Sequence, residues 1–265
     1  MRREASTVGP AKARAGRVGR PHGVGVRESS RMTTSSEAAP ARSRFALVLS
    51  IAVILGVWVW QLARHPGGAP LPPTFAEFVL KIARSKSLVV AIVAALLWLG
   101  GEGPASVGLT RRDWARRLGF GLALGLPFFV VFNVALDGLL SGVFPKTPAS
   151  GPSVTTFFRD PRNLAAWLPI GILGGGFVEE LQRIFVLTRF EKRFGRPGLV
   201  FALVASSAMF GWGHLYQGVG TAIGTGLSGM TLGLLYLRRR SALEPMAVHA
   251  CADVLAVLAA TLLAR

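Results

Sequence analysis

Cysteine and charged side chains are both scarce in this chain of 265 residues, and each scarcity excludes a class of protein. The single cysteine, Cys251, excludes an internal disulfide partner and any zinc site built from cysteines. Only 16% of the residues are charged, well below the roughly 25% of soluble domains. Since 51% are hydrophobic, a water-soluble fold would expose large apolar patches, which monomers avoid. We therefore expect the lipid bilayer to surround the protein.

Acidic residues are fewer than basic ones, 13 against 30, which gives a net charge of +17. That charge could indicate nucleic-acid binding, but its distribution argues against it. Eight basic residues lie in residues 1–31, and most others form short clusters between apolar runs, where membrane proteins keep topogenic charge. No basic stripe with interleaved aromatic residues follows a folded segment. We expect no nucleic-acid partner.

The chain divides into three parts by composition. We interpret residues 1–44 as a disordered basic extension, because the first 31 residues are rich in Arg, Gly, Ala and Val without periodicity. Met32 is a candidate for the true start. Residues 45–150 hold N-terminal transmembrane helices, and residues 160–265 hold the transmembrane helices with polar residues of interest.

Apolar runs predict an all-α fold, a polytopic transmembrane bundle of about seven spans (six to eight), since a spanning helix needs about 20 apolar residues. The expected spans are 45–63, 86–101, 118–141, 163–188, 198–214, 219–237 and 243–263. The second is the weakest, and its helix could begin within the amphipathic stretch 74–87. Four prolines in 142–162 predict an irregular connector there.

Loop charges predict the orientation of the bundle. With the N-terminus in the cytoplasm, three arginine-containing loops share the inner side: 102–117, 189–197 and 238–241. This arrangement follows the positive-inside rule in tendency, although Lys81, Arg84 and Lys86 would then lie outside. We expect a multi-pass protein of the plasma (inner) membrane.

Five ionisable residues interrupt three of the last four expected spans or their ends. Glu179 and Glu180 lie in one span, His214 ends the next, and His249 and Asp253 lie in the last. Each ionisable side chain in the bilayer core costs about 2.5–3.5 kcal/mol on insertion scales. Such costs indicate mutual pairing, a function, or both.

Helical spacing suggests how these residues pair. Arg183 is i+4 from Glu179 and i+3 from Glu180, so it can neutralise either and leave the other facing a cavity as a general base. Asp253 follows His249 by four residues and could orient its ring. Each motif alone also has a structural explanation, namely a charge cluster at a span end or a histidine packed among aromatic residues.

Taken together, the motifs resemble the CAAX-protease and bacteriocin-processing (CPBP) family, also called the Rce1-like or Abi family. Its pattern is Glu-Glu-x-x-x-Arg, then Phe-x-x-x-His, then His-x-x-x-Asn/Asp, all on transmembrane helices. This chain has, in that order, Glu179-Glu180, Phe210-x-x-x-His214 and His249-x-x-x-Asp253. The stretch 229–238 is also similar to the family's glycine-rich helix. The resemblance covers roughly residues 160–263.

One position departs from the family pattern. Arg183 lies one residue earlier than expected, and Ile184 occupies the usual place of the arginine. The roles of Glu179 and Glu180 are therefore open at this point. A local π-bulge, which is common at functional sites, could restore the register.

The resemblance implies an intramembrane endopeptidase. By analogy, Glu179 with His214 would activate a water, while His249 and residue 253 would stabilise the oxyanion. An ionised Asp253 would repel an oxyanion, so we expect it instead to hold His249 as an imidazolium. Glu180 completes the candidate catalytic set, with Arg183 as its structural ion pair and Phe210 in a supporting role.

Zinc is the alternative cofactor, because Glu, His and Asp are acceptable zinc ligands and members of the family are often labelled metalloproteases. The chain has no His-Glu-x-x-His motif, and the glutamate mechanism needs no ion, so we expect no metal. The expected substrate is a peptide or protein segment at the membrane. The rival functions are a non-catalytic scaffold or immunity-like protein and a proton-coupled transporter.

Overall fold

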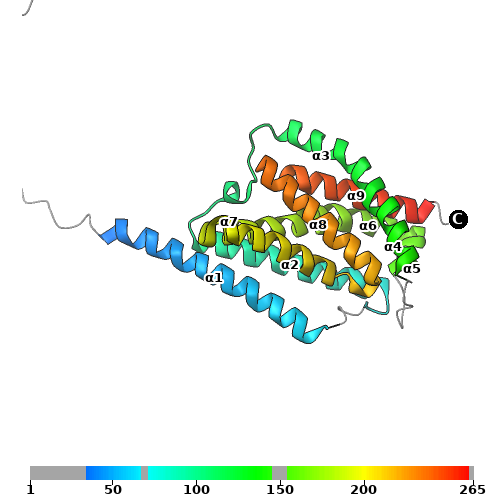
Figure 1. The fold of residues 1–265 in the computed structure, drawn as a ribbon, viewed down its shortest axis with the longest axis horizontal. Helices are drawn as coiled ribbons and strands as arrows, with labels where there is room; N and C mark the ends of the chain where they lie inside the picture. The colour runs from blue at the N-terminus through cyan, green and yellow to red at the C-terminus, as the bar shows by residue number, and fades with distance from the viewer. Residues whose placement is uncertain (1–33, 67–70, 145–153, 263–265) are drawn as a thin grey trace, which may run out of the picture.

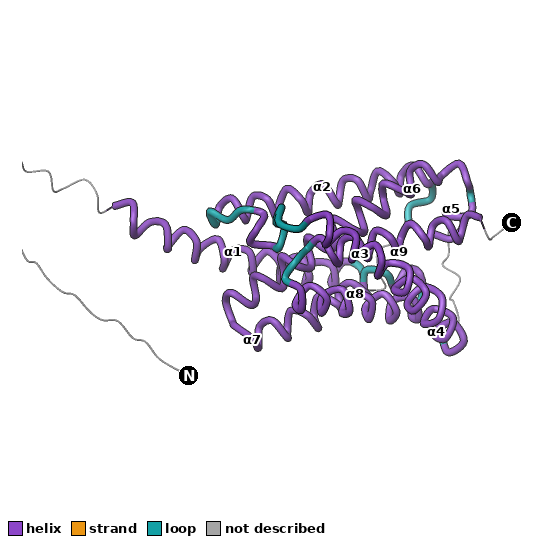
Figure 2. Tube along the Cα trace, turned by 90° about the horizontal axis from the view of Figure 1, so that it is seen from above, coloured by secondary structure: helices purple, strands orange, loops and turns teal. Residues whose placement is uncertain are grey.

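A computed structural model describes residues 34–66, 71–144 and 154–262. Within these ranges the chain forms helices and no strand, which confirms the all-α prediction. Most of the long helices run side by side along the longest axis of the molecule (Figure 1), and the view from above shows the same bundle (Figure 2).

The helices follow one another with short connections. They are α1 (Thr34–Arg64), α2 (Phe75–Leu99), the 3₁₀ turn η1 (Pro104–Val107), α3 (Trp114–Phe129), the π-helix η2 (Val130–Leu136), α4 (Asp137–Val143), α5 (Val154–Arg159), the 3₁₀ turn η3 (Pro161–Asn163), α6 (Leu164–Pro169), the π-helix η4 (Ile170–Glu179), α7 (Glu180–Trp212), the 3₁₀ turn η5 (Leu215–Gln217), α8 (Val219–Arg239) and α9 (Leu243–Leu262).

Five helical stretches of the described chain are long and apolar enough to cross a membrane: Ala41–Arg64, Phe75–Leu99, Trp114–Val143, Pro161–Trp212 and Leu243–Leu262. A polytopic membrane protein is therefore confirmed. The expected span 219–237 is helical as α8, yet it is not among the five, because its glycine, threonine and serine residues lower its hydropathy.

The 52-residue stretch is two antiparallel helices rather than one crossing. A straight helix of that length would measure roughly 78 Å, against a hydrocarbon core of about 30 Å. Gly195, at φ 64° and ψ −148°, interrupts the helix. A Cβ added to Gly233 of α8 would lie 2.5 Å from Leu203 and 3.8 Å from Leu187, so both halves pass the same point. The hairpin accounts for the expected pair 163–188 and 198–214.

Two boundary predictions need correction, and one open alternative is confirmed. Helix α1 begins at Thr34, so residues 34–44 of the extension predicted to be disordered are helical, while residues 1–33 and Met32 lie outside the described residues. Helix α2 begins at Phe75, within the amphipathic stretch that was considered for it, after the N-cap Thr74. Lys86, expected outside the membrane, is consequently in the middle of this helix.

The second correction concerns the expected connector 142–162. Residues 154–159 of this stretch form α5, and residues 161–163 form η3. Pro161 opens the 3₁₀ turn, and the side chain of Asp160 accepts a hydrogen bond from the Arg162 N–H at 3.0 Å. Proline is suited to a first helical position, where no N–H is needed, so here it starts a helix instead of breaking one.

Helix α9 packs between α3 and η4, with glycines on both sides. A Cβ on Gly121 would lie 2.6 Å from Ala247, and one on Gly125 would overlap Cys251. On the other side, a Cβ on Gly176 would lie 2.5 Å from the Ala250 Cβ. Small residues allow helices to approach closely in lipid. The position of α9, which carries His249 and Asp253, therefore depends on these glycines.

A buried ion pair fixes the loop after α2 to α7. Glu102 accepts two hydrogen bonds from Arg189, at 2.6 and 2.8 Å, and also contacts Lys192. Arg189 is only 1% exposed. Burial raises the pKa of Glu102, but the two cations outweigh this effect and lower it to about 2. The pairing therefore stabilises the fold most where Glu102 is fully ionised.

The first prediction follows from this pair. The Glu102→Gln variant should be less stable by about 1–3 kcal/mol at pH 7, because Arg189 loses its charged partner. Since the folded pKa is lowered, the wild-type advantage should be complete above pH 4.5 and disappear as the pH falls toward 2. Thermal unfolding in detergent across this range measures it, with exposed Glu77→Gln as control. An advantage that is unchanged at low pH would contradict the prediction.

Candidate active site

The two neighbouring glutamates lie at the junction of a π-helix and an α-helix. Glu179 is the last residue of η4, and Glu180 is the first residue of α7. The π-helix ends before Glu180, and residues 180–183 are α-helical, so the structure shows no bulge that restores the register of Arg183. Three consecutive buried glycines, residues 174–176, belong to this π-helix.

Arg183 pairs with Glu180, one of the two partners that its spacing allowed. Its Nε lies 3.1 Å from Glu180 Oε2, and the two side chains are 3% and 0% exposed. The guanidinium also stacks 4.4 Å from the centre of the Phe210 ring. Glu180 is thus neutralised in the interior and does not line either of the cavities described below.

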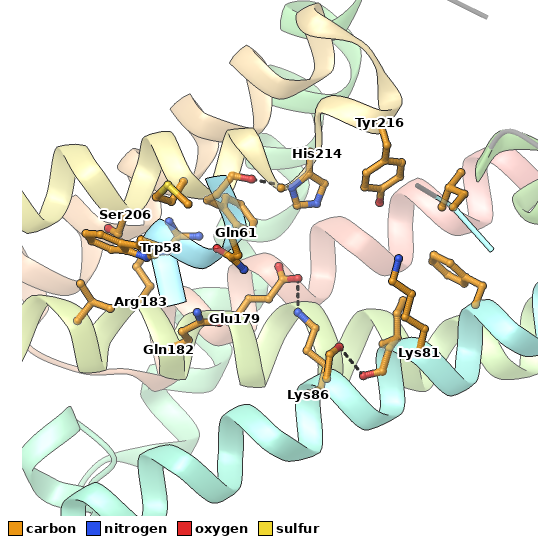
Figure 3. A pocket seen from close by; sticks show the side chains of 18 residues that line it. Trp58, Gln61, Lys81, Lys86, Glu179, Gln182, Arg183, Ser206, His214 and Tyr216 are labelled. Carbon is orange, nitrogen blue, oxygen red and sulfur yellow. Dashed lines mark hydrogen bonds and ion pairs between the residues drawn. The ribbon is translucent and has the colours of Figure 1, made fainter. Parts of the chain in front are cut away.

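Glu179 instead faces open space, and its partner is a residue that sequence reasoning missed. Lys86 of α2 donates a hydrogen bond of 2.6 Å to Glu179 Oε1. Their side chains are 23% and 18% exposed. Figure 3 shows Lys86 extending from α2 to Glu179, with Glu179 between Lys86 and His214 in this view. The sequence did contain a signal for this contact, because Lys86 is the first residue of the expected span 86–101.

His249 contacts both glutamates. Its Nδ1 lies 2.9 Å from Glu180 Oε1, so the ring N–H donates to that carboxylate. Its Nε2 lies 3.7 Å from Glu179 Oε2 and 3.7 Å from Asp253 Oδ1. We expected Asp253 to orient the ring, but Glu180 makes that hydrogen bond. The reason is geometric, since Glu180 reaches Nδ1 whereas Asp253 flanks Nε2.

His214 is fixed through its backbone neighbour. Its Nδ1 lies 2.8 Å from the Phe210 carbonyl oxygen, which only accepts hydrogen bonds, so Nδ1 carries the proton and Nε2 of the neutral ring is an acceptor. The Phe210 ring meets the rings of His214 and His249 edge-on, with centroids 4.9 and 6.0 Å away. Phe210 therefore orients both histidines and the guanidinium of Arg183.

Two cavities of about 350 and 280 Å³ meet at the glutamate. Both are lined by Phe78, Ile82, Lys86, Glu179, Phe210, His214 and Tyr216. The larger extends between α1, α2 and α7, and the smaller reaches His249, Asp253 and α8. A side chain that lines both cavities can contact a substrate peptide that occupies both of them.

Tyr216, in η5, is a second residue that sequence reasoning missed. Its hydroxyl accepts a hydrogen bond of 2.9 Å from the Gln217 amide. Burial raises the pKa of Tyr216 to about 12, so the phenol stays protonated and can donate to a substrate. Nothing in the spacing of the apolar runs distinguished this tyrosine from an ordinary interfacial one.

Within the part of the chain that the structure describes, no three His, Cys, Asp or Glu side chains are arranged to hold a metal ion. The Nδ1 of His249 is already bonded to Glu180, and Glu179 is bonded to Lys86. The metal-free site stays a prediction, which the chelator assay described below tests.

A family model matches part of the chain. Residues 161–255 match the model of the family described as type II CAAX prenyl endopeptidase Rce1-like. The matched segment spans less than half of the chain and is similar to this family. The Rce1-like family consists of CAAX-type intramembrane proteases, and the match begins at η3 and ends two residues after Asp253. Lys86 therefore lies outside it. No curated protein and no solved structure matches the chain.

Neighbouring glycines provide the second prediction. A Cβ on Gly176 would lie 2.9 Å from the Met246 carbonyl oxygen, so Gly176→Ala should separate α9 from η4 and cost about 1–3 kcal/mol. A Cβ on Gly175 would overlap only the carboxylate tip of Asp253, which can rotate away. Gly175→Ala should therefore unfold close to the wild-type temperature. Equal destabilisation of the two variants in a thermal unfolding assay would contradict this packing.

Proposed function

We propose that this protein is an intramembrane endopeptidase that hydrolyses a peptide bond with a glutamate-activated water. The observation that carries the proposal is the division between the two glutamates. Glu180 is enclosed by Arg183 and His249, whereas Glu179 lines both cavities close to the two histidines. A buried carboxylate that keeps access to a cavity has the position required of a general base.

In the proposed reaction, Glu179 takes a proton from a water while the water oxygen bonds to the scissile carbonyl carbon. His214 assists by accepting a hydrogen bond from that water at Nε2, because its Nδ1 proton is held by Phe210. The protonated Glu179 then gives its proton to the leaving amine as the carbon–nitrogen bond breaks. The products are a carboxylic acid and an amine, and Glu179 returns to its starting state.

His249 would stabilise the oxyanion. Since its Nδ1 proton is donated to Glu180, Nε2 can donate a second hydrogen bond only from the imidazolium form. Glu180 and Asp253 are the acidic neighbours that balance this positive charge. In this scheme Glu180 is a positioning residue, and Asp253 supports the imidazolium without touching the oxyanion.

The proposed substrate is a peptide or protein segment presented at the membrane. The larger cavity is lined by Trp58, Leu71 and Phe78 as well as by polar groups, so it suits a peptide with apolar side chains. We place the protein in the plasma (inner) membrane with its arginine-rich loops in the cytoplasm. A scaffold or a transporter would make the same polar cluster but release no peptide product.

The third prediction tests the reaction and the roles of the glutamates together. Purified protein in detergent is screened against a membrane-peptide library, and products are identified by mass spectrometry. Glu179→Gln should lower kcat by about 10³-fold, because it removes the base. It should lower the unfolding temperature less than Glu180→Gln does, because the Lys86–Glu179 pair is part-exposed whereas the Arg183–Glu180 pair is buried. Glu180→Gln should lower the unfolding temperature, because Arg183 loses its charged partner.

A chelator arm of the same assay examines zinc. Cleavage should continue at the same rate in the presence of the chelator. Loss of cleavage that added zinc restores would overturn the metal-free mechanism. Absence of any product from the wild-type protein, together with substrate flux in proteoliposomes, would overturn the protease assignment.

A further inference from the structure

Lys86, whose side chain contacts Glu179, lies outside the segment 161–255 that matches the Rce1-like model. It lies on α2, 93 positions before Glu179, and its ammonium donates the 2.6 Å hydrogen bond to that carboxylate. It also lines both cavities, so a substrate at their border can reach it. A Cβ placed on Gly174 would lie 3.9 Å from Lys86 Cε, so the lysine stem passes a glycine that leaves it room to move.

The charges of the site show why a cation is needed at this point. Glu180 is balanced by Arg183, and His249 lies between Glu180, Glu179 and Asp253. Without Lys86, the two carboxylates nearest to His249 Nε2, those of Glu179 and Asp253, would have one imidazolium between them. A developing oxyanion would then form beside an excess of negative charge.

We propose that Lys86 is a further catalytic residue, which transfers its hydrogen bond from Glu179 to the oxyanion during attack. This inference rests on the proposed protease function. As Glu179 accepts the proton of the water, its negative charge is lost, and an equal charge appears on the carbonyl oxygen. The ammonium is a compact cation on a flexible four-carbon stem, so it can follow that charge over a short distance.

The step conserves atoms and charge. One proton moves from water to Glu179, one carbon–oxygen bond forms, and the carbonyl π electrons move to the oxygen, while Lys86 keeps all its protons. The ammonium donates its hydrogen bond to Glu179 in the ground state and to the oxyanion during attack. It therefore stabilises the transition state more than the bound substrate, and its loss should lower kcat more than it raises KM.

A structural role for Lys86 makes a different prediction. If the ammonium only held α2 against η4, its loss would mainly lower the stability of the protein. Any fall in kcat would then come from movement of α2 and would not depend on a positive charge at this position. The catalytic and the structural role can be separated by measuring kcat, KM and the effect of restoring the positive charge.

The fourth prediction uses Lys86→Met, which keeps the length of the side chain and removes its charge. We expect kcat to fall by about 10²–10³-fold, the usual effect of losing one oxyanion donor, with KM changed less than threefold. The matched control is Arg84→Gln, which removes one positive charge from an exposed position of the same helix and should keep wild-type kinetics.

Chemical rescue provides the decisive arm. Cys251 is the sole cysteine, so Lys86→Cys in a Cys251→Ala background carries one thiol. Alkylation with 2-bromoethylamine restores an ammonium at nearly the same distance and should recover most of the lost kcat. Alkylation with 1-bromopropane fills the same space without charge and should recover none.

Each outcome has one meaning. Wild-type kcat in Lys86→Met, a rise in KM alone, or equal rescue by the two reagents overturns the catalytic role of Lys86 and leaves the protease proposal standing. A wild-type protein that cleaves no peptide overturns the protease proposal and this inference with it.

Discussion

The pairing of Glu180 with Arg183 and His249 is the interaction on which the rest of the site depends. Two adjacent carboxylates in a membrane interior are costly unless each has a counter-charge. Arg183 reaches the second glutamate from three residues away, and His249 donates to the same carboxylate. Glu180 therefore has a structural role, because both of its partners are inside the bundle. Glu179 is the glutamate that lines the cavities.

Backbone shape makes this pairing possible. The π-helix η4 ends at Glu179, and its glycines lie against α9. Any side chain at Gly176 would push α9 away, and one at Gly175 would displace the Asp253 carboxylate. The glycines therefore act on function indirectly, because they set the distance between the helix of the glutamates and the helix of His249.

Much of this arrangement could be predicted from the sequence. Apolar runs indicated the helices, and ionisable residues within them indicated the cluster of Glu179, His214 and His249. The start of α2 within the amphipathic stretch was considered, yet Lys86 was expected outside the membrane. Hydropathy is averaged over a run of residues, so it does not show the direction in which a single side chain points. The hydrogen bond from His249 to Glu180 was also missed, since i,i+4 spacing favours Asp253 and says nothing of contacts between distant helices.

The central claim is that a water activated by Glu179, with Glu180 only holding the site together, cleaves the peptide. Cleavage in water enriched in oxygen-18, followed by mass spectrometry of the products, tests it most directly. One heavy oxygen is expected in each new carboxyl group from the wild-type protein and from Glu180→Gln, and Glu179→Gln should release product about 10³-fold more slowly. Labelled product from Glu179→Gln at the wild-type rate would contradict it.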